Sequence, residues 1–237
     1  MIGGMRLRMN LNILFEDQHI IVVVKAPGVP SQKDRSGDVN MLTLIEEHLQ
    51  KKLDHNKQPY VGLIHRLDRP VGGVMLFAKT PYANARLSEQ IRLNKIKKEY
   101  LAVVCGKPKN EGELLTHYLM KQTNNLSRVV TENTSLAKKS ILEYSFIQSK
   151  VVEKWGEISL LNIKLITGRH HQIRVQLSFV GLPIWGDTKY NETFGLIDSK
   201  EWFSIALFAH LLSFEHPKTG KSMTFTIDTT EYPFDQF

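Results

Sequence analysis

The sequence contains a single cysteine, Cys105, among its 237 residues. An internal disulfide is therefore impossible, and this sparse use of cysteine is typical of proteins in the reducing cytoplasm. No apolar stretch reaches the roughly 20 residues that span a bilayer. Residues 1–12 also lack the apolar core of a signal peptide. We therefore expect a cytoplasmic protein without a membrane span.

Sequence motifs for nucleotide cofactors and metals are absent as well. There is no P-loop, and no Gly-x-Gly-x-x-Gly follows a predicted strand. His170 and His171 are adjacent, so on a helix their side chains would diverge by roughly 100° instead of sharing a face as zinc ligands do. No cysteine or carboxylate completes a ligand set with them. The sequence thus predicts neither a metal nor a cofactor.

The charge balance is modestly basic, with 31 Lys and Arg against 24 Asp and Glu and a net charge of +7. This excess suits a polyanionic partner such as RNA, but it equally suits a soluble basic protein. The apolar fraction of 42% argues against wholesale disorder. Because no linker, repeat or low-complexity tract divides the chain, we expect one domain over residues 1–237, with residues 1–12 as an N-terminal extension.

Apolar periodicity predicts an α+β fold with a mixed, largely antiparallel sheet flanked by helices. Asn40 should cap a helix whose apolar stripe runs to Leu53, and Thr80 followed by Pro81 should start another. A short helix should follow Thr167-Gly168 and end at Gly181. The predicted strands are 13–15, 20–24, 74–78, 95–105, 112–120, 127–130, 139–147, 158–166, 208–214 and 223–227.

Residues 63–79 place a cluster of charged side chains directly before an apolar run. Asp68 lies between Arg66 and Arg69, and Gly72-Gly73 then permits a sharp turn or a close backbone approach before the apolar strand. Burying a lone carboxylate is costly, so flanking cations make physical sense. A purely structural ion-pair cluster remains an alternative interpretation of this arrangement.

Three segments in this order resemble the RluA family of RNA pseudouridine synthases. They are His65-Arg66-Leu67-Asp68-Arg69, the Lys-x-Tyr-x-Ala-x-Val-x-Gly pattern around Tyr100, and Thr-Gly-Arg-x-His-Gln-Ile-Arg-Val at 167–175 with Gly-x-Pro-Ile-x-Gly-Asp-x-x-Tyr at 181–190. The resemblance begins at about residue 13 and leaves no room for the S4-type RNA-binding module of many members. One departure is Pro70-Val71-Gly72, where the family often has Asp-Thr-Ser.

The resemblance implies roles for particular residues. Asp68 would be the catalytic nucleophile, Arg169 its ion-pair partner, and Tyr100 the platform on which the target uracil stacks. His65, Arg66, Arg69 and Arg174 are candidates for RNA contacts or for support of the site. Converting uridine to pseudouridine changes no atom count and transfers no electrons, which agrees with the prediction of no cofactor.

The resemblance also implies the partner, which would be ribosomal or transfer RNA, and we expect a monomer. A non-catalytic RNA-binding or RNA-folding protein on the same scaffold is the alternative. Such a protein would bind RNA with strong salt dependence and form no pseudouridine. A glycoside hydrolase or nucleosidase is a weaker third possibility, which release of free uracil would reveal.

Overall fold

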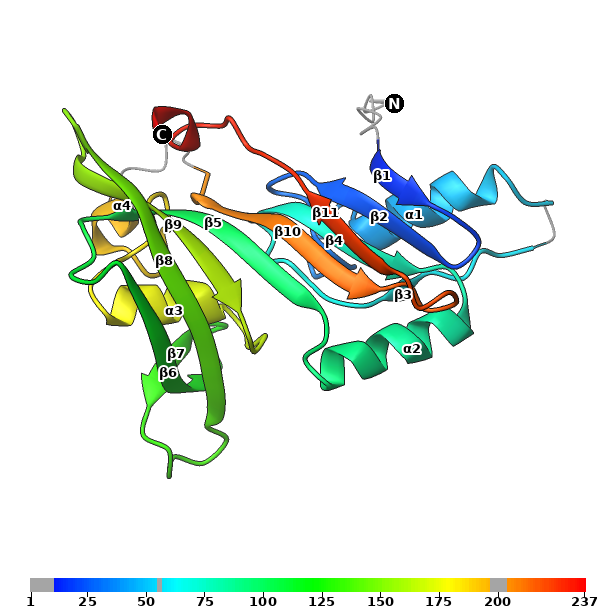
Figure 1. Ribbon diagram of the computed structural model, residues 1–237, viewed down its shortest axis with the longest axis horizontal. Helices are drawn as coiled ribbons and strands as arrows, with labels where there is room; N and C mark the ends of the chain where they lie inside the picture. The colour runs from blue at the N-terminus through cyan, green and yellow to red at the C-terminus, as the bar shows by residue number, and fades with distance from the viewer. Residues whose placement is uncertain (1–10, 55–56, 197–203) are drawn as a thin grey trace.

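The computed structural model describes residues 11–54, 57–196 and 204–237 (Figure 1). Its helices are α1 (Met41–Gln50), α2 (Pro81–Arg92), α3 (Gln172–Phe179), α4 (Glu192–Gly195) and the 3-10 turn η1 (Phe234–Gln236). Its strands are β1 (Asn12–Glu16), β2 (Ile20–Lys25), β3 (Gly62–Leu63), β4 (Gly72–Ala78), β5 (Lys97–Cys105), β6 (Gly112–Lys121), β7 (Ser127–Val130), β8 (Lys138–Val152), β9 (Gly156–Leu165), β10 (Leu207–Glu215) and β11 (Ser222–Thr226). Most of the predicted extension, up to residue 10, falls outside the described residues.

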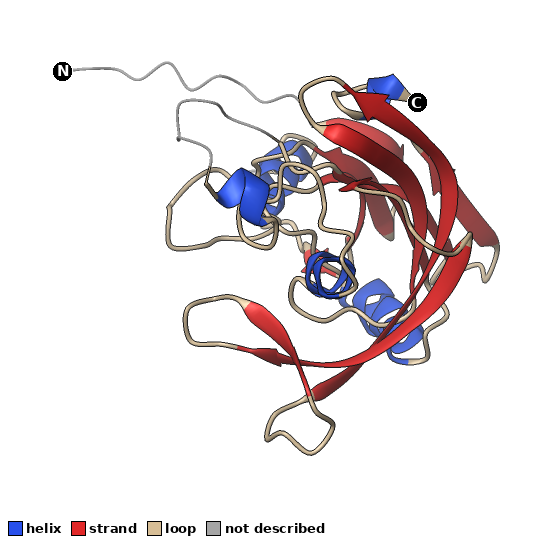
Figure 2. Cartoon of the chain, turned by 90° about the vertical axis from the view of Figure 1, so that its left-hand side faces the viewer, coloured by secondary structure: helices blue, strands red, loops and turns tan. Residues whose placement is uncertain are grey.

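The described strands form one 11-stranded sheet in the order β1-β2-β4-β10-β5-β9-β8-β6-β7, with β3 beside β4 and β11 beside β10. β10 pairs with β4 in parallel, and the other strand pairs are antiparallel. The sheet curves strongly, as Figure 2 shows. The predicted α+β class with a mixed, largely antiparallel sheet is confirmed.

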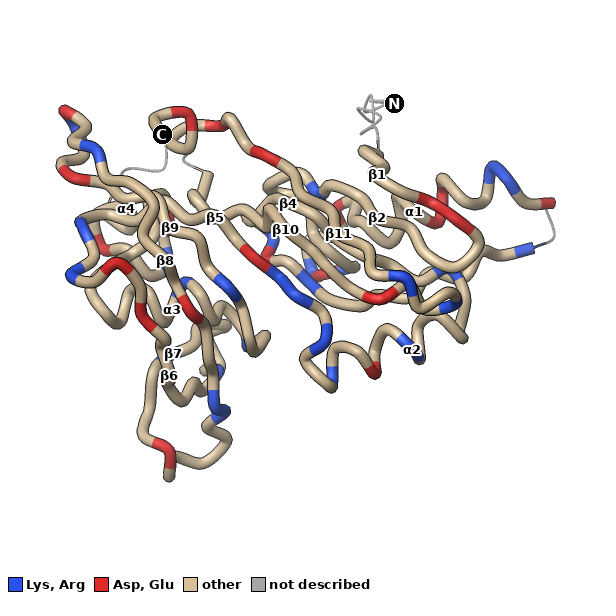
Figure 3. Tube along the Cα trace, in the orientation of Figure 1, with Lys and Arg blue, Asp and Glu red and all other residues tan. Residues whose placement is uncertain are grey.

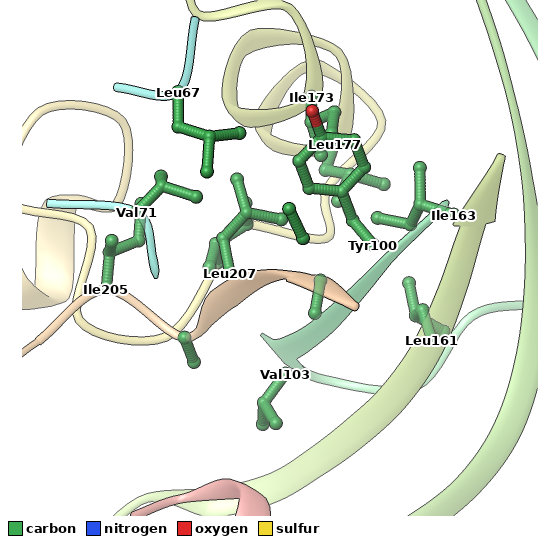
Figure 4. Close-up of a cluster of buried hydrophobic side chains, with 14 of the residues drawn as sticks. Leu67, Val71, Tyr100, Val103, Leu161, Ile163, Ile173, Leu177, Ile205 and Leu207 are labelled. Carbon is green, nitrogen blue, oxygen red and sulfur yellow. The ribbon is translucent and has the colours of Figure 1, made fainter. Parts of the chain in front are cut away.

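Helices α1 and α2 cover opposite faces of β2 and β4. Along β2, Ile21 and Val23 join the core with α1, whereas Ile20 and Val22 join the smaller core with α2. Successive strand residues point to opposite faces, so a strand covered on both sides reads as an unbroken apolar run. Helix α3 joins the same core as α1 through Ile173 and Leu177, both labelled in Figure 4. No helix in the described parts of the chain is long and apolar enough to cross a bilayer.

Helices α1 and α2 start at the predicted capping residues, but α1 ends before the predicted residue. Asn40 Oδ1 accepts the Thr43 amide at 3.3 Å, and Thr80 Oγ1 accepts the Ala83 amide at 3.1 Å. Both caps satisfy amides that have no partner within the first helical turn. Helix α1 stops at Gln50, however, and Leu53 is 39% exposed. The prediction that Leu53 belongs to the buried stripe was wrong.

Gly73 of β4 lies directly against Ala209 of β10. It has φ +129°, and a Cβ there would lie 2.3 Å from the Ala209 carbonyl oxygen and 2.5 Å from the Ala209 nitrogen. The close backbone approach predicted at Gly72-Gly73 is therefore confirmed. This contact fixes the strand that follows the Asp68 segment.

Gly73→Ala should lower the free energy of unfolding by about 2–5 kcal/mol, since it combines backbone strain with a steric clash. Gly28→Ala is the matched control, because Gly28 has φ +84° but no atom within 4 Å of an added Cβ. That substitution should cost only about 1–2 kcal/mol. Urea denaturation of both variants makes the comparison, and equal losses would contradict the proposed clash.

Candidate active site

A cleft of about 810 Å³ lies where the Asp68 segment, the start of β5 and the β9–α3 connection meet. Pockets that hold a drug-sized ligand measure about 300–1,000 Å³, so a nucleotide fits. The cleft walls contain every site residue predicted from the sequence, namely His65, Arg66, Asp68, Arg69, Tyr100, Arg169 and Arg174. Segments far apart in the chain thus meet at one surface.

Short contacts fix the backbone on both sides of Asp68. Ser31 Oγ accepts the Leu67 amide at 3.1 Å and donates to the Leu67 carbonyl at 2.7 Å. The Val71 amide donates to the Asp68 carbonyl at 3.0 Å. The Asp68 side chain itself remains 29% exposed, facing the cleft. Asp68 therefore sits on a rigid segment with its carboxylate open to a ligand.

A buried lysine, Lys25 at the end of β2, supports the same segment. Its Nζ donates to the carbonyls of Val29 at 2.6 Å and Arg69 at 2.9 Å. Burial lowers the pKa of Lys25 to about 7, although the nearby Asp68 charge acts to raise it. Lys25 thus joins the β2 end to the residue after Asp68, a role that its sequence position does not reveal.

The guanidinium beside Asp68 belongs to Arg174, in α3. Arg174 Nη1 lies 3.2 Å from Asp68 Oδ2. Asp187 holds the same guanidinium by two further bonds, from Nε at 2.8 Å and from Nη2 at 2.7 Å. Burial acts to lower the pKa of Arg174, but Asp187 and Asp68 outweigh it and raise that pKa. Asp68 therefore faces a fixed, permanently charged cation.

The expected ion pair between Asp68 and Arg169 was wrong. Arg169 is exposed on the cleft wall, and its Nε donates to the Lys139 carbonyl at 3.2 Å. It precedes α3, whereas Arg174 lies within the helix and is only 4% exposed. The motif contains two arginines, and only the one inside the helix is directed at the carboxylate.

The four predicted RNA-contact residues fall into different environments. Arg174 is buried between two carboxylates, so it supports the site, the second of the two predicted roles, and is not free for a phosphate. Arg69 also lines the cleft, where its Nε donates to the Gly28 carbonyl at 3.0 Å and its guanidinium pairs with Asp34 and Asp38. Arg66 is exposed on the cleft wall and remains available to an anion.

His65 supports the site as a neutral side chain. Its Nε2 accepts the Leu76 amide at 3.2 Å, so the ring proton lies on Nδ1. Burial, followed by the charge of Lys98, lowers the pKa of His65 to about 3. The ring therefore carries no charge for a phosphate at neutral pH.

Tyr100 lies on β5 between β9 and β10, opposite Ile163 and Ala209. Its ring is 6% exposed and lies among apolar side chains at the cleft, with Ile173 and Leu177 of α3 close to it in Figure 4. Burial and the Asp68 charge raise the pKa of Tyr100, so its hydroxyl stays protonated. An aromatic face at this position suits the stacking of an unpaired base.

Other cleft residues add positive charge around the site. Lys98, Arg92 and Lys121 all line the cleft. Figure 3 shows basic positions where α2 leads into β5. Such a wall raises the local concentration of a polyanion. Within the described ranges, no group of three or more His, Cys, Asp or Glu residues is placed to hold a metal ion.

Asp187→Asn should destabilise the protein by about 3–5 kcal/mol, because it breaks a buried pair and leaves Arg174 with less compensation. Asp187 is 1% exposed. The exposed pair of Glu143 and Lys164, at 3.2 Å, offers the control Glu143→Gln. That control should lose less than about 1 kcal/mol. Similar urea midpoints for the two variants would contradict a buried role for Asp187.

Known proteins resemble this chain over most of its length. The family model for RNA pseudouridylate synthase matches residues 19–179. An uncharacterized RNA pseudouridine synthase of Helicobacter pylori strain J99 is 30% identical over 234 residues, covering 95% of this chain and 70% of the relative. Ribosomal large subunit pseudouridine synthase D of Buchnera aphidicola (subsp. Schizaphis graminum) is 28% identical over 229 residues, covering 91% and 69%.

The fold has solved counterparts as well. The structure of human RNA pseudouridylate synthase domain containing 1 matches with a TM-score of 0.75 at 20% identity, covering 94% of this chain and 85% of the human one. Family model, relatives and fold agree over most of the chain. The chain therefore belongs to the RluA family of RNA pseudouridine synthases, enzymes that isomerise uridine in RNA to pseudouridine.

Proposed function

We propose that Asp68 is the nucleophile of the isomerisation and that Arg174, instead of Arg169, is its charged partner. The observation that carries this proposal is the 3.2 Å contact between Arg174 Nη1 and Asp68 Oδ2 at the wall of an open cleft. A nucleophilic carboxylate must be ionised, and a fixed guanidinium both favours the anion and orients it. Tyr100 provides the surface for the extruded uracil.

The proposed reaction balances without a cofactor. The Asp68 carboxylate attacks C1′ of the ribose, the N1–C1′ bond breaks, and the electron pair leaves with N1 of the uracil. The base turns, C5 attacks C1′, and the ester to Asp68 breaks to restore the carboxylate. C5 then loses its proton and N1 gains one. The uridine must leave its stack for this chemistry, which the open cleft permits.

We further propose that the substrate is RNA of the large ribosomal subunit, modified by a cytoplasmic monomer built as one catalytic domain. The names of relatives support this substrate, since Buchnera and Nitrosomonas proteins similar to this chain are ribosomal large subunit pseudouridine synthases. The continuous sheet supports the single domain.

The experiment is a pseudouridine map of total RNA from cells with and without the gene. The proposal predicts that one or a few large-subunit sites disappear with the gene and return with the wild-type copy. Loss of transfer RNA sites alone would move the substrate to that class. An unchanged map together with salt-sensitive RNA binding would identify a non-catalytic binder, and release of free uracil would identify a nucleosidase.

A further inference from the structure

One backbone amide and two side chains connect the β6–β7 hairpin to the site carboxylate. The Ser127 amide donates to the Tyr190 hydroxyl at 2.8 Å. The same hydroxyl lies 2.7 Å from His171 Nδ1. His171 Nε2 in turn lies 3.7 Å from Asp68 Oδ2. His171 and Tyr190 thus form a second layer behind the proposed nucleophile.

The Ser127 amide favours one placement of the proton on the neutral His171 ring. A backbone amide only donates, so the Tyr190 oxygen accepts at Ser127 and keeps its hydrogen free to donate to His171 Nδ1. His171 Nδ1 is then the acceptor, and a neutral ring carries its proton on Nε2, the nitrogen that faces Asp68. Burial lowers the pKa of His171 to about 4, so the ring is neutral at physiological pH.

Several contacts hold this ring in place. It stacks on the His170 ring at 3.8 Å between centroids and meets the Tyr190 ring edge-on at 5.5 Å. The His171 backbone adopts the left-handed conformation with φ +53°, which turns the chain into α3. The His171 side chain is 7% exposed. Its orientation is therefore set before any substrate arrives.

Within the described residues, the Asp68 side chain makes two ion-pair contacts, with Arg174 and with His171. Both are made by Oδ2. Oδ1 has no hydrogen-bond or ion-pair partner among these residues. Contacts at catalytic sites are often long without substrate and tighten when substrate binds. Oδ2 is thus the held oxygen, and Oδ1 is free to meet the ribose.

We propose that His171 is a positioning residue whose Nε2–H, oriented by the Tyr190 hydroxyl, helps Arg174 to hold Oδ2 of Asp68 and so presents Oδ1 to C1′. This inference rests on the proposed nucleophilic role of Asp68. The arrangement adds a neutral donor to a charged one, which directs the carboxylate without adding a second cation.

Tyr190→Phe tests the orienting hydroxyl while keeping the ring that packs on His171 and on the Arg174 guanidinium. Losing the hydrogen bond that orients His171 should lower kcat about tenfold, the effect of about one hydrogen bond on the barrier. The KM for RNA should stay unchanged. Tyr118→Phe is the matched control, because the exposed Tyr118 hydroxyl pairs with Glu132 outside the cleft. Equal kcat values for the two variants would overturn the proposal.

Nitrogen NMR of the histidine rings gives a readout that does not depend on activity. Wild-type His171, assigned with the His171→Gln variant, should show protonated Nε2 and unprotonated Nδ1. In Tyr190→Phe a mixture of tautomers should appear. A wild-type ring with its proton on Nδ1 would contradict the inference even if the enzyme is fully active.

Two substitutions at His171 separate positioning from backbone conformation. The amide nitrogen of His171→Gln reaches the Nε2 position, whereas that of His171→Asn falls short. Asparagine suits the left-handed backbone better than glutamine. If His171 positions the carboxylate, His171→Gln should be more active than His171→Asn. If its role is only to allow the backbone conformation, His171→Asn should be the more active variant. If wild type forms no pseudouridine in any RNA, the proposed function fails, while the NMR result still decides the tautomer.

Discussion

Asp68→Asn should reduce pseudouridine formation by at least roughly 10⁴-fold, the scale of loss when a nucleophile is removed. The neutral amide cannot attack C1′, although it fills the same space. Arg174 keeps both bonds to Asp187, so the fold and the affinity for RNA should persist. Single-turnover assays on the mapped RNA, with binding measured in parallel, check both expectations.

The matched control for this variant is Asp54→Asn. Asp54 is 83% exposed in its side chain and pairs with Lys57 at 3.4 Å, away from the cleft. Asp54→Asn removes the same charge as Asp68→Asn and should leave turnover unchanged. Residual activity of Asp68→Asn within tenfold of wild type would exclude Asp68 as the nucleophile.

Arg174→Lys should lower kcat about 100-fold, although it keeps the positive charge. A lysine cannot span Asp68 and Asp187 with the planar fork of a guanidinium, so the carboxylate loses its fixed partner. Charge-assisted hydrogen bonds contribute about 1.5–3 kcal/mol, which corresponds to such a loss. Thermal unfolding of the variant separates this effect from any loss of folded protein.

The comparison variant is Arg169→Lys, in the arginine exposed on the cleft wall. Because its Nε contacts only the Lys139 carbonyl at 3.2 Å, its kcat should stay within about twofold, the change expected for a weak surface contact. Any effect should appear in the KM for RNA. A large kcat loss in Arg169→Lys with little loss in Arg174→Lys would reverse the assignment.

The sequence predicted local features, such as helix caps and a close backbone approach, where a single physical rule determines them. The Asn40 and Thr80 caps satisfy nearby amides, and Gly73 permits a backbone approach that no other residue allows. The end of α1 was not readable, because the apolar spacing continues to Leu53 after the helix has stopped. Side-chain periodicity says little about where backbone hydrogen bonds end.

The family resemblance implied that Asp68 and Tyr100 share one active site, and both line the same cleft. The implied pairing of Asp68 with Arg169 was wrong. Choosing between Arg169 and Arg174 requires knowing which arginine the helix turns inward. The buried Asp187 that holds Arg174 lies in another segment, so only the folded chain reveals the pair.

The most direct test is a crystal structure of the Asp68→Asn variant bound to its substrate RNA. The proposal predicts an unstacked uridine in the cleft, its base against Tyr100 and its C1′ about 3.5 Å from the side chain at position 68, the spacing of a group poised to attack. Arg174 should remain behind that side chain. A target uridine bound elsewhere, or held with C1′ directed away from position 68, would contradict the proposed mechanism.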